Sequence, residues 1–155
     1  GDYPVESVAM MAHIDEKAEN NLDKFGREVF DFDKSDVTET IGSAVANAAR
    51  DLNIKTIVAS TKSGYTARMI SKYRPSADVL ALTYDERVQR SLMINWGIQP
   101  FVVDRPESTD EMFRVAGEKA KELGFAQAGD LIIVVAGTPS GNAGTTNLMR
   151  VLQVK

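Results

Sequence analysis

Short apolar runs separated by segments of helical pattern fill most of this chain, and this alternation constrains the fold more than any other feature. The runs lie at 56–60, 78–83, 100–104 and 130–137, and they are rich in β-branched and aliphatic residues. Strands buried on both faces of a parallel sheet have this composition, and the crossovers between parallel strands are usually helices. We therefore predict an α/β fold with three layers, α/β/α, around a mainly parallel sheet.

A fifth strand is predicted at 147–154. It follows the run at 130–137 through a loop without helical pattern, so the helix of a parallel crossover is missing. The last strand is therefore expected to pair antiparallel, at or near an edge of the sheet. An edge strand leaves backbone N–H and C=O groups unpaired, and the same strand of another subunit could pair with them.

Capping patterns mark where the predicted helices begin and end. Asp36 followed by Glu39, and Ser108 followed by Glu111, have the spacing of a capping box, and Gly124 suits the end of the later helix. The apolar face of the first of these helices is expected to consist of Ile41, Ala44, Val45, Ala48 and Leu52. The helices predicted in this region cover 36–52, 66–73, 85–95 and 108–123.

The beginning of the chain has a different character. Pro4 suits a first helical position, and apolar residues recur on one face through 4–20, whereas 21–35 is polar, irregular and interrupted by glycine. We predict an N-terminal helix (1–20), a linker (21–35) and an α/β domain (36–155). The apolar face of a single helix needs a partner, and we expect that partner to lie outside this chain.

Composition excludes several classes of protein. The chain has 155 residues, which suits about one domain, and 43% of them are hydrophobic, which is enough for a buried core. The formal net charge of −4 argues against a nucleic-acid-binding protein. Cysteine is absent, so disulfides and thiolate metal sites are excluded. No run approaches the roughly 18 apolar residues of a membrane span, no signal peptide is recognisable, and a cytoplasmic location is expected.

The loop between the first strand and the following helix has the chemistry of a phosphate site. A helix that begins near Tyr65 presents unpaired backbone N–H groups and the positive end of its dipole to this loop. Gly64 permits close approach of the backbone, and Lys62 supplies a full positive charge. The hydroxyl donors are Ser60, Thr61, Ser63 and Thr66. Ordinary helix capping explains the same residues, and the G-x-x-x-x-G-K-[ST] pattern of nucleotide hydrolases is absent.

A second loop, 137–147, follows the fourth strand and is rich in glycine and hydroxylated residues. It is longer than a simple connection, which favours a functional flap, while a flexible turn remains the alternative. Ligands of open α/β sheets bind beyond the carboxyl ends of the strands. Both loops are therefore predicted to lie on the same side of the sheet and to form a shared site.

A catalytic nucleophile or general base cannot be identified in this predicted site. His13, the only histidine, lies on the N-terminal helix, where a surface position is expected. No Ser/His/Asp set can be assembled around the loops, and the carboxylates of 31–36 lack the spacing of a calcium loop. Trp96 and the six methionines are expected to fill packing space. A phosphate pocket without a nucleophile or a base favours binding over catalysis, and no metal or cofactor is expected in this chain.

Ordered motifs of the chain resemble the C-terminal part of pyruvate kinase. "GDYPVESVAMM" is similar to the last helix of that family's catalytic (β/α)8 barrel. "STKSG" with "ARMISKYRPSADVLALT" is similar to the start of its effector-binding domain, and "GDLIIVVAGTPSG" with "GTTNLMRV" is similar to the end of that domain. The resemblance covers 1–20 and about 36–155, and it explains the isolated first helix, whose partner would be the barrel.

The resemblance implies a regulatory role within an enzyme of glycolysis. Whole pyruvate kinases are cytoplasmic tetramers that transfer a phosphoryl group from phosphoenolpyruvate to ADP, and they bind magnesium and potassium in the barrel. The part that this chain resembles is non-catalytic and binds an allosteric activator, commonly a sugar phosphate. The residues that would hold its phosphate are Ser60, Thr61, Lys62, Ser63, Gly64, Tyr65 and Thr66. The flap over the sugar would consist of Gly141, Asn142, Ala143, Gly144 and Thr145.

One part of the family pattern is absent. Animal and yeast members carry a tryptophan and an arginine, close to the helix after the third strand, that grip a second phosphate. The corresponding stretch, 104–115, has no tryptophan and places Met112 at the arginine position, with Arg105 and Arg114 nearby. A monophosphate, such as a pentose phosphate or a nucleotide, therefore competes with fructose 1,6-bisphosphate as the expected effector, and some members of the family respond to neither.

Two other functions fit the sequence. A stand-alone sugar-phosphate phosphatase would need a general base near the first loop, and Asp85 and Glu86, after the second strand, are the best-placed candidates. A purely structural association module would have loops that bind nothing. Turnover of phosphorylated sugars would identify the first of these, and a lack of binding in calorimetry would identify the second.

Overall fold

The computed structural model describes residues 1–19, 36–137 and 145–155. Contacts divide the chain into two units, Gly1–Phe32 and Asp33–Lys155. In the first unit, helix α1 spans Pro4–Glu19, as predicted, and none of its side chains is buried. The predicted linker, 21–35, lies outside the described residues. Among the helices that the structure describes, none combines the length and the apolar character needed to cross a bilayer.

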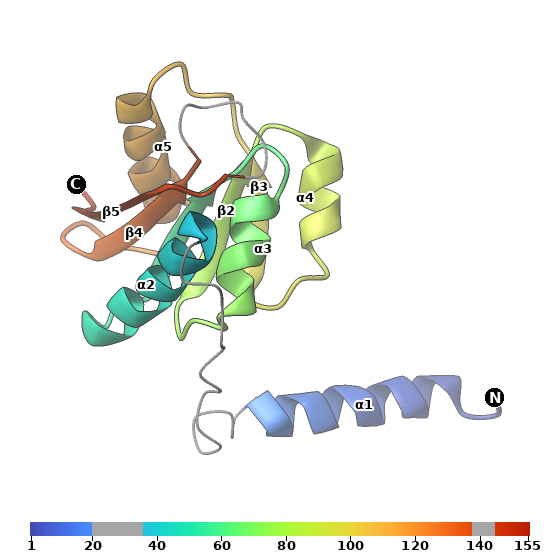
Figure 1. Ribbon diagram of the computed structural model, residues 1–155. Coiled ribbons are helices and arrows are strands. Elements are labelled where there is room, and N and C mark those ends of the chain that lie inside the picture. The colour runs from blue at the N-terminus through green and yellow to red at the C-terminus, as the bar shows by residue number, and fades with distance from the viewer. Residues whose placement is uncertain (20–35, 138–144) are drawn as a thin grey trace. The chain divides into compact units, whose positions relative to one another are not determined.

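Within 36–137 and 145–155, a five-stranded sheet forms the centre of the second unit (Figure 1). Its strands are β1 (Thr56–Ser60), β2 (Asp78–Thr83), β3 (Ile98–Val102), β4 (Leu131–Ala136) and β5 (Leu148–Gln153). They lie in the order β3-β2-β1-β4-β5, and all neighbours pair parallel except β4 and β5. The prediction of a mainly parallel sheet with an antiparallel last strand at an edge is confirmed.

Helices cover both faces of this sheet, which confirms the predicted three layers (Figure 1). They are α2 (Val37–Asp51), α3 (Tyr65–Lys72), α4 (Glu86–Leu92) and α5 (Thr109–Glu122). Successive side chains of a strand point to opposite faces. Ile57 of β1 accordingly packs in a buried cluster with residues of α2, α3 and α4, whereas its neighbour Val58 packs in a cluster with residues of α5.

The buried face of α2 differs from the predicted one. Ala44 and Leu52, which the apolar pattern placed in that face, are exposed. The buried residues of the helix are Thr38, Gly42, Val45, Ala46 and Ala49. The small residues face inward because another side chain packs closely there: a Cβ atom at Gly42 would lie 2.6 Å from Cε2 of Tyr73. The close approach of that ring, rather than the size of the apolar side chains, sets the rotation of α2.

The segment between α4 and β3 also departs from the sequence prediction. Helix α4 ends at Leu92 rather than near 95, and β3 begins at Ile98 rather than at Pro100. Proline lacks an N–H donor and is excluded from the middle of central strands. Because β3 forms an edge of the sheet, Pro100 is tolerated inside the strand.

Candidate ligand-binding site

The turn from β1 to α3, here called the corner (residues 60–66), lies at the carboxyl end of the parallel strands. Its first residues continue the backbone pairing of β1 with β2, since the N–H of Thr61 donates to the carbonyl oxygen of Leu82 at 2.9 Å. Gly64 is the N-cap of α3, and its φ of +79° is a left-handed conformation that favours glycine. No side-chain hydrogen bond from the cap residue covers the first N–H groups of α3. The start of this helix is therefore suited to accept an external anion.

Arg68 places a second positive charge at the corner, close to Gly64. A Cβ atom at this position would lie 2.6 Å from Nη1 of Arg68 and 3.0 Å from Cδ2 of Leu92. Nη2 of Arg68 donates to the carbonyl oxygen of Ser63 at 3.0 Å, so the guanidinium turns back toward the start of its own helix. Arg68 is not among the residues that the sequence predicted for this site. The available signal was its position four residues after the cap, since long helical side chains lean toward the N-terminus.

Positive charge therefore gathers at the corner. Lys62 and Arg68 are both exposed. Among the described helices, α3 alone has no acidic residue in its first turn. A cation near a helix N-terminus is unfavourable by itself, because it adds to the positive end of the helix dipole. This arrangement favours the binding of an anion.

The residues predicted to hold a phosphate divide into two sets. The buried members are Ser60, Thr61, Gly64 and Thr66, and the half-buried or exposed members are Lys62, Ser63 and Tyr65. Oγ of Ser60 lies 3.1 Å from the hydroxyl of Tyr84, and Oγ1 of Thr66 accepts a hydrogen bond from Thr146. These two inner hydroxyls contact other protein groups, so they support the turn. The outer set is the part of the corner that can face a solute.

The described end of the second loop contacts the corner. Near the end of this loop, Thr146 is 1% exposed, and its hydroxyl donates to Oγ1 of Thr66 at 3.0 Å. The N–H of Thr146 donates to Oγ1 of Thr38, on α2, at 3.4 Å. Thr145 is exposed, and the other predicted flap residues, 141–144, lie outside the described residues.

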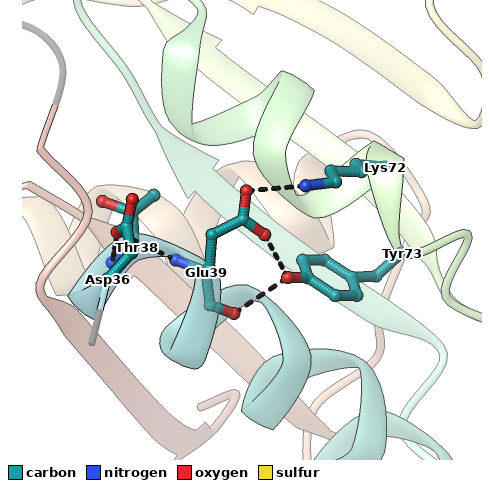
Figure 2. Close-up of polar contacts among 5 residues, drawn as sticks. All are labelled: Asp36, Thr38, Glu39, Lys72 and Tyr73. Atoms are coloured by element: carbon teal, nitrogen blue, oxygen red, sulfur yellow. Dashed lines mark hydrogen bonds and ion pairs between the residues drawn. The ribbon is translucent and has the colours of Figure 1, made fainter. Parts of the chain in front are cut away.

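A cluster of polar contacts holds α2 against α3 (Figure 2). Asp36 caps α2 by accepting from the N–H groups of Thr38, at 2.7 Å, and Glu39, at 3.3 Å. In a capping box the Glu39 carboxylate would return to the cap, but here it extends to α3. It accepts from Nζ of Lys72 at 2.6 Å and from the hydroxyl of Tyr73, which also donates to the Glu39 carbonyl oxygen at 3.1 Å.

Electrostatics strengthens this cluster. The hydrogen bonds from Lys72 and Tyr73 hold the pKa of Glu39 below its ordinary value. Burial and the hydrogen bond to Glu39 raise the pKa of Tyr73. At neutral pH an ionised carboxylate therefore accepts from a protonated phenol and an ammonium group, and such charge-assisted bonds are stronger than neutral ones.

The groups considered for catalysis have structural roles or lie elsewhere. Asp85 is the N-cap of α4 and accepts from the N–H of Arg87 at 2.7 Å, and Glu86 pairs with Arg90 on the surface. His13 is exposed on α1. In the described parts of the chain, no group of three histidines or carboxylates could hold a metal ion. The positions of Asp85 and Glu86 therefore give no support to a phosphatase.

The stretch considered for a second phosphate forms the start of α5. Met112 is 4% exposed and belongs to the interior. Arg114 pairs with Glu118 at 2.7 Å and with Glu111 at 3.3 Å, and these carboxylates raise its pKa. Arg105 is exposed and precedes the helix. Because Arg114 is already paired with two carboxylates, Arg105 is the better candidate for a second phosphate.

Comparison with known proteins gives consistent matches. A family model described as "Pyruvate kinase, alpha/beta domain" matches residues 39–152. The chain is 51% identical over 154 residues to the pyruvate kinase of Lactobacillus delbrueckii subsp. bulgaricus, which covers 97% of this chain and 26% of that protein. It is 51% identical over 156 residues to the pyruvate kinase of Lactococcus lactis subsp. lactis, covering 100% of this chain and 31% of that one. The chain thus spans about a quarter to a third of the length of these relatives.

Solved structures agree with the sequence matches. A pyruvate kinase from Cryptosporidium parvum superposes with a TM-score of 0.68 at 34% identity, over 77% of this chain and 23% of that chain. A structure of the Cryptosporidium parvum pyruvate kinase in complex with ADP gives a TM-score of 0.70 at 32% identity, over 80% of this chain and 25% of that chain. The chain therefore belongs to the family of pyruvate kinase alpha/beta domains.

Proposed function

We propose that this chain is the C-terminal regulatory part of a pyruvate kinase and that its corner binds the phosphate of a small-molecule activator, such as a sugar phosphate. The parent enzyme would be cytoplasmic and tetrameric and would transfer a phosphoryl group from phosphoenolpyruvate to ADP. Its magnesium and potassium would bind in a catalytic barrel of which α1 is the last helix. Residues 21–35 would link that barrel to the domain at 36–155, and the domain itself would be non-catalytic.

The observation that carries the proposal is the concentration of positive charge at an uncapped helix start. A phosphate could accept hydrogen bonds from the first N–H groups of α3, while Lys62 and Arg68 neutralise its charge. Ser63 could add a hydroxyl. Gly64 fits this role because its left-handed backbone begins α3 and the absence of a Cβ atom leaves room for the Arg68 guanidinium beside it.

Calorimetric titration of the chain with fructose 1,6-bisphosphate, ribose 5-phosphate and inorganic phosphate tests this proposal. Lys62→Ala removes one charge from the corner and should raise Kd about tenfold or more, the effect of losing a charged hydrogen bond. Lys55→Ala is the matched control, because Lys55 is an exposed lysine that precedes the opposite end of the same strand, β1. If none of the phosphates binds, or if the two variants weaken binding equally, the proposed site is wrong.

The same titrations show whether the effector carries one phosphate group or two. The interior position of Met112 supports a monophosphate, because it leaves no arginine at that point. We expect ribose 5-phosphate to bind at least as tightly as fructose 1,6-bisphosphate. If the bisphosphate binds more tightly, Arg105→Ala should abolish the difference, since Arg105 is the remaining candidate for its second phosphate.

Strand β5 is the proposed contact for oligomer assembly. It lies at an edge of the sheet, and its Val151 is 38% exposed. Pairing of two β5 strands would satisfy the outer N–H and C=O groups of both. Sedimentation of the chain with Val151→Lys should show weaker self-association than the unmodified chain, because an edge lysine opposes strand pairing. An unchanged sedimentation profile would place the contact elsewhere.

A further inference from the structure

The first turn of α2 is joined to both ends of α3 by separate contacts. At the start of α3, Thr66 accepts from Thr146, and the N–H of Thr146 donates to Thr38 of α2. At the end of α3, Tyr73 donates to Glu39 of α2. The helix that begins at the corner therefore cannot shift without straining the beginning of α2.

The threonine contact lies in the interior. Thr38 is 7% exposed, Thr66 is 3% exposed and Thr146 is 1% exposed. A buried polar group that loses its partner has no water to replace it, so such a contact tends to be either made or lost as a whole. The contact can thus transmit a displacement of the corner rather than absorb it.

The tyrosine contact is equally constrained. The ring of Tyr73 packs against Gly42, and its hydroxyl reaches the carboxylate of Glu39, which Lys72 also holds (Figure 2). The ring is fixed by packing at one end and by hydrogen bonds at the other. Tyr73 lies in the stretch 67–83 that resembles the start of the effector-binding domain, and the phosphate site itself gives it no role.

We propose that the first turn of α2, Asp36 to Thr40, responds to ligand binding at the corner. An anion bound at the start of α3 would order this turn through the contacts of Thr146 and Tyr73. The inference rests on the proposed function. Its physical basis is that an anion bound to the first N–H groups of α3 restricts the motion of the first turn of α3. The hydrogen bonds of Thr146 and Tyr73 then restrict the first turn of α2 as well. In chain order, α2 is the first described helix of the unit Asp33–Lys155, so the effect would arrive next to the proposed link to the barrel.

A first experiment needs no ligand. Gly64→Ala places a strained residue at the corner, and amide hydrogen exchange by NMR should show α2 first-turn amides exchanging about fivefold faster or more. Gly124→Ala is the matched control, because Gly124 has the same φ of +79° but lies in open space after α5. If Gly64→Ala changes the amides of α3 and leaves the first turn of α2 unchanged, the mechanical link is absent.

A second experiment uses the sugar phosphate that binds more tightly. It should slow exchange in the first turn of α2 in the unmodified chain. Tyr73→Phe keeps the ring and removes the hydroxyl, so it should reduce this slowing, because only the threonine contact remains, while Kd stays within about threefold. Tyr84→Phe, which removes a tyrosine hydroxyl that contacts Ser60 at the corner, should leave the slowing in place.

The outcomes separate this inference from the proposed function. If a sugar phosphate binds and α2 exchange does not respond, or if Tyr73→Phe leaves the response intact, the inference is overturned while the phosphate site stands. If no sugar phosphate binds, the proposed function fails. The link between corner and α2 is then decided by Gly64→Ala alone.

Discussion

The ring of Tyr73 lies so close to Gly42 that a Cβ atom on residue 42 would be 2.6 Å from Cε2 of the ring. We predict that Gly42→Ala destabilises the domain. Alanine is better than glycine in a helix interior by about 1 kcal/mol, but overpacking costs typically about 1–3 kcal/mol. Because the ring is held by Glu39, the clash should dominate, with a net loss of about 1–2 kcal/mol in urea unfolding.

Gly117→Ala is the control for that substitution. This glycine is also helical, but its Cβ atom would meet nothing closer than Cδ1 of Leu152, at 3.9 Å. The variant should gain about 0.5–1 kcal/mol from helix propensity. Equal effects of the two substitutions would mean that Tyr73 yields freely and does not fix α2.

The stability of the domain should depend on pH through Glu39. Because its pKa is lowered on folding, the ionised carboxylate stabilises the folded state above about pH 4.3, the ordinary value in an unfolded chain. This contribution is lost as the pH falls through the lower folded value. The stability difference between the unmodified chain and Glu39→Gln, measured by urea unfolding, should therefore shrink as the pH falls from 7 to 3.

The matched comparison for Glu39 is Glu118→Gln, which removes a carboxylate from a surface pair with Arg114. Exposed pairs contribute little, so the pH dependence of this variant should stay close to that of the unmodified chain.

Tyr73 should make the stability depend on pH in the alkaline range. Its pKa is raised on folding, so its contribution is present below about pH 10 and is lost as the pH rises above that value.

Two glycines with the same backbone conformation should respond differently to alanine. Gly64 and Gly124 both have a φ of +79°, but only Gly64 has side chains, from Arg68 and Leu92, within 3.0 Å of the Cβ position. Gly124→Ala should cost about 1–2 kcal/mol, the strain of a left-handed alanine. Gly64→Ala should cost more in thermal or urea unfolding, and an equal cost would show that the corner is less crowded than described.

Two buried threonines should also differ. Within the described residues, Oγ1 of Thr83 is buried without a hydrogen-bond partner, whereas Oγ1 of Thr56 donates to the carbonyl oxygen of Phe125 at 2.6 Å. Thr83→Val should be neutral or stabilising by up to about 1 kcal/mol, because it removes an unsatisfied hydroxyl. Thr56→Val should cost about 1 kcal/mol in the same assay. A loss at Thr83 similar to that at Thr56 would reveal a partner for its hydroxyl.

The sheet could be predicted from the sequence because its signals are local. Runs such as 78–83 are bounded by clear turn residues, and the missing helix before 147–154 is enough to indicate an antiparallel partner. The corner could be located for the same reason, since a strand, a glycine and a helix start follow one another in the chain.

What the sequence did not reveal depends on long-range contacts. The apolar pattern of α2 favoured Leu52, but the Tyr73 ring requires the small residues to face inward. The spacing of Asp36 and Glu39 predicted a capping box, but the Glu39 carboxylate is stabilised more by an ammonium and a phenol on α3. Likewise, Thr66 could be recognised as a hydroxyl at the corner, but its partner Thr146 is 80 positions away.

The two flanks of the sheet are chemically unequal, and Pro100 is the reason. The N–H of Val103 donates to Thr83, so alternation along β3 turns the backbone groups of Pro100 away from β2. Proline has no hydrogen to offer there, and its carbonyl oxygen already accepts from Nε2 of Gln89 at 3.1 Å. If two copies pair through β5, as proposed, the β3 flank opposes further sheet extension, so assembly through the sheet would stop at two copies and would not grow into an open-ended fibre.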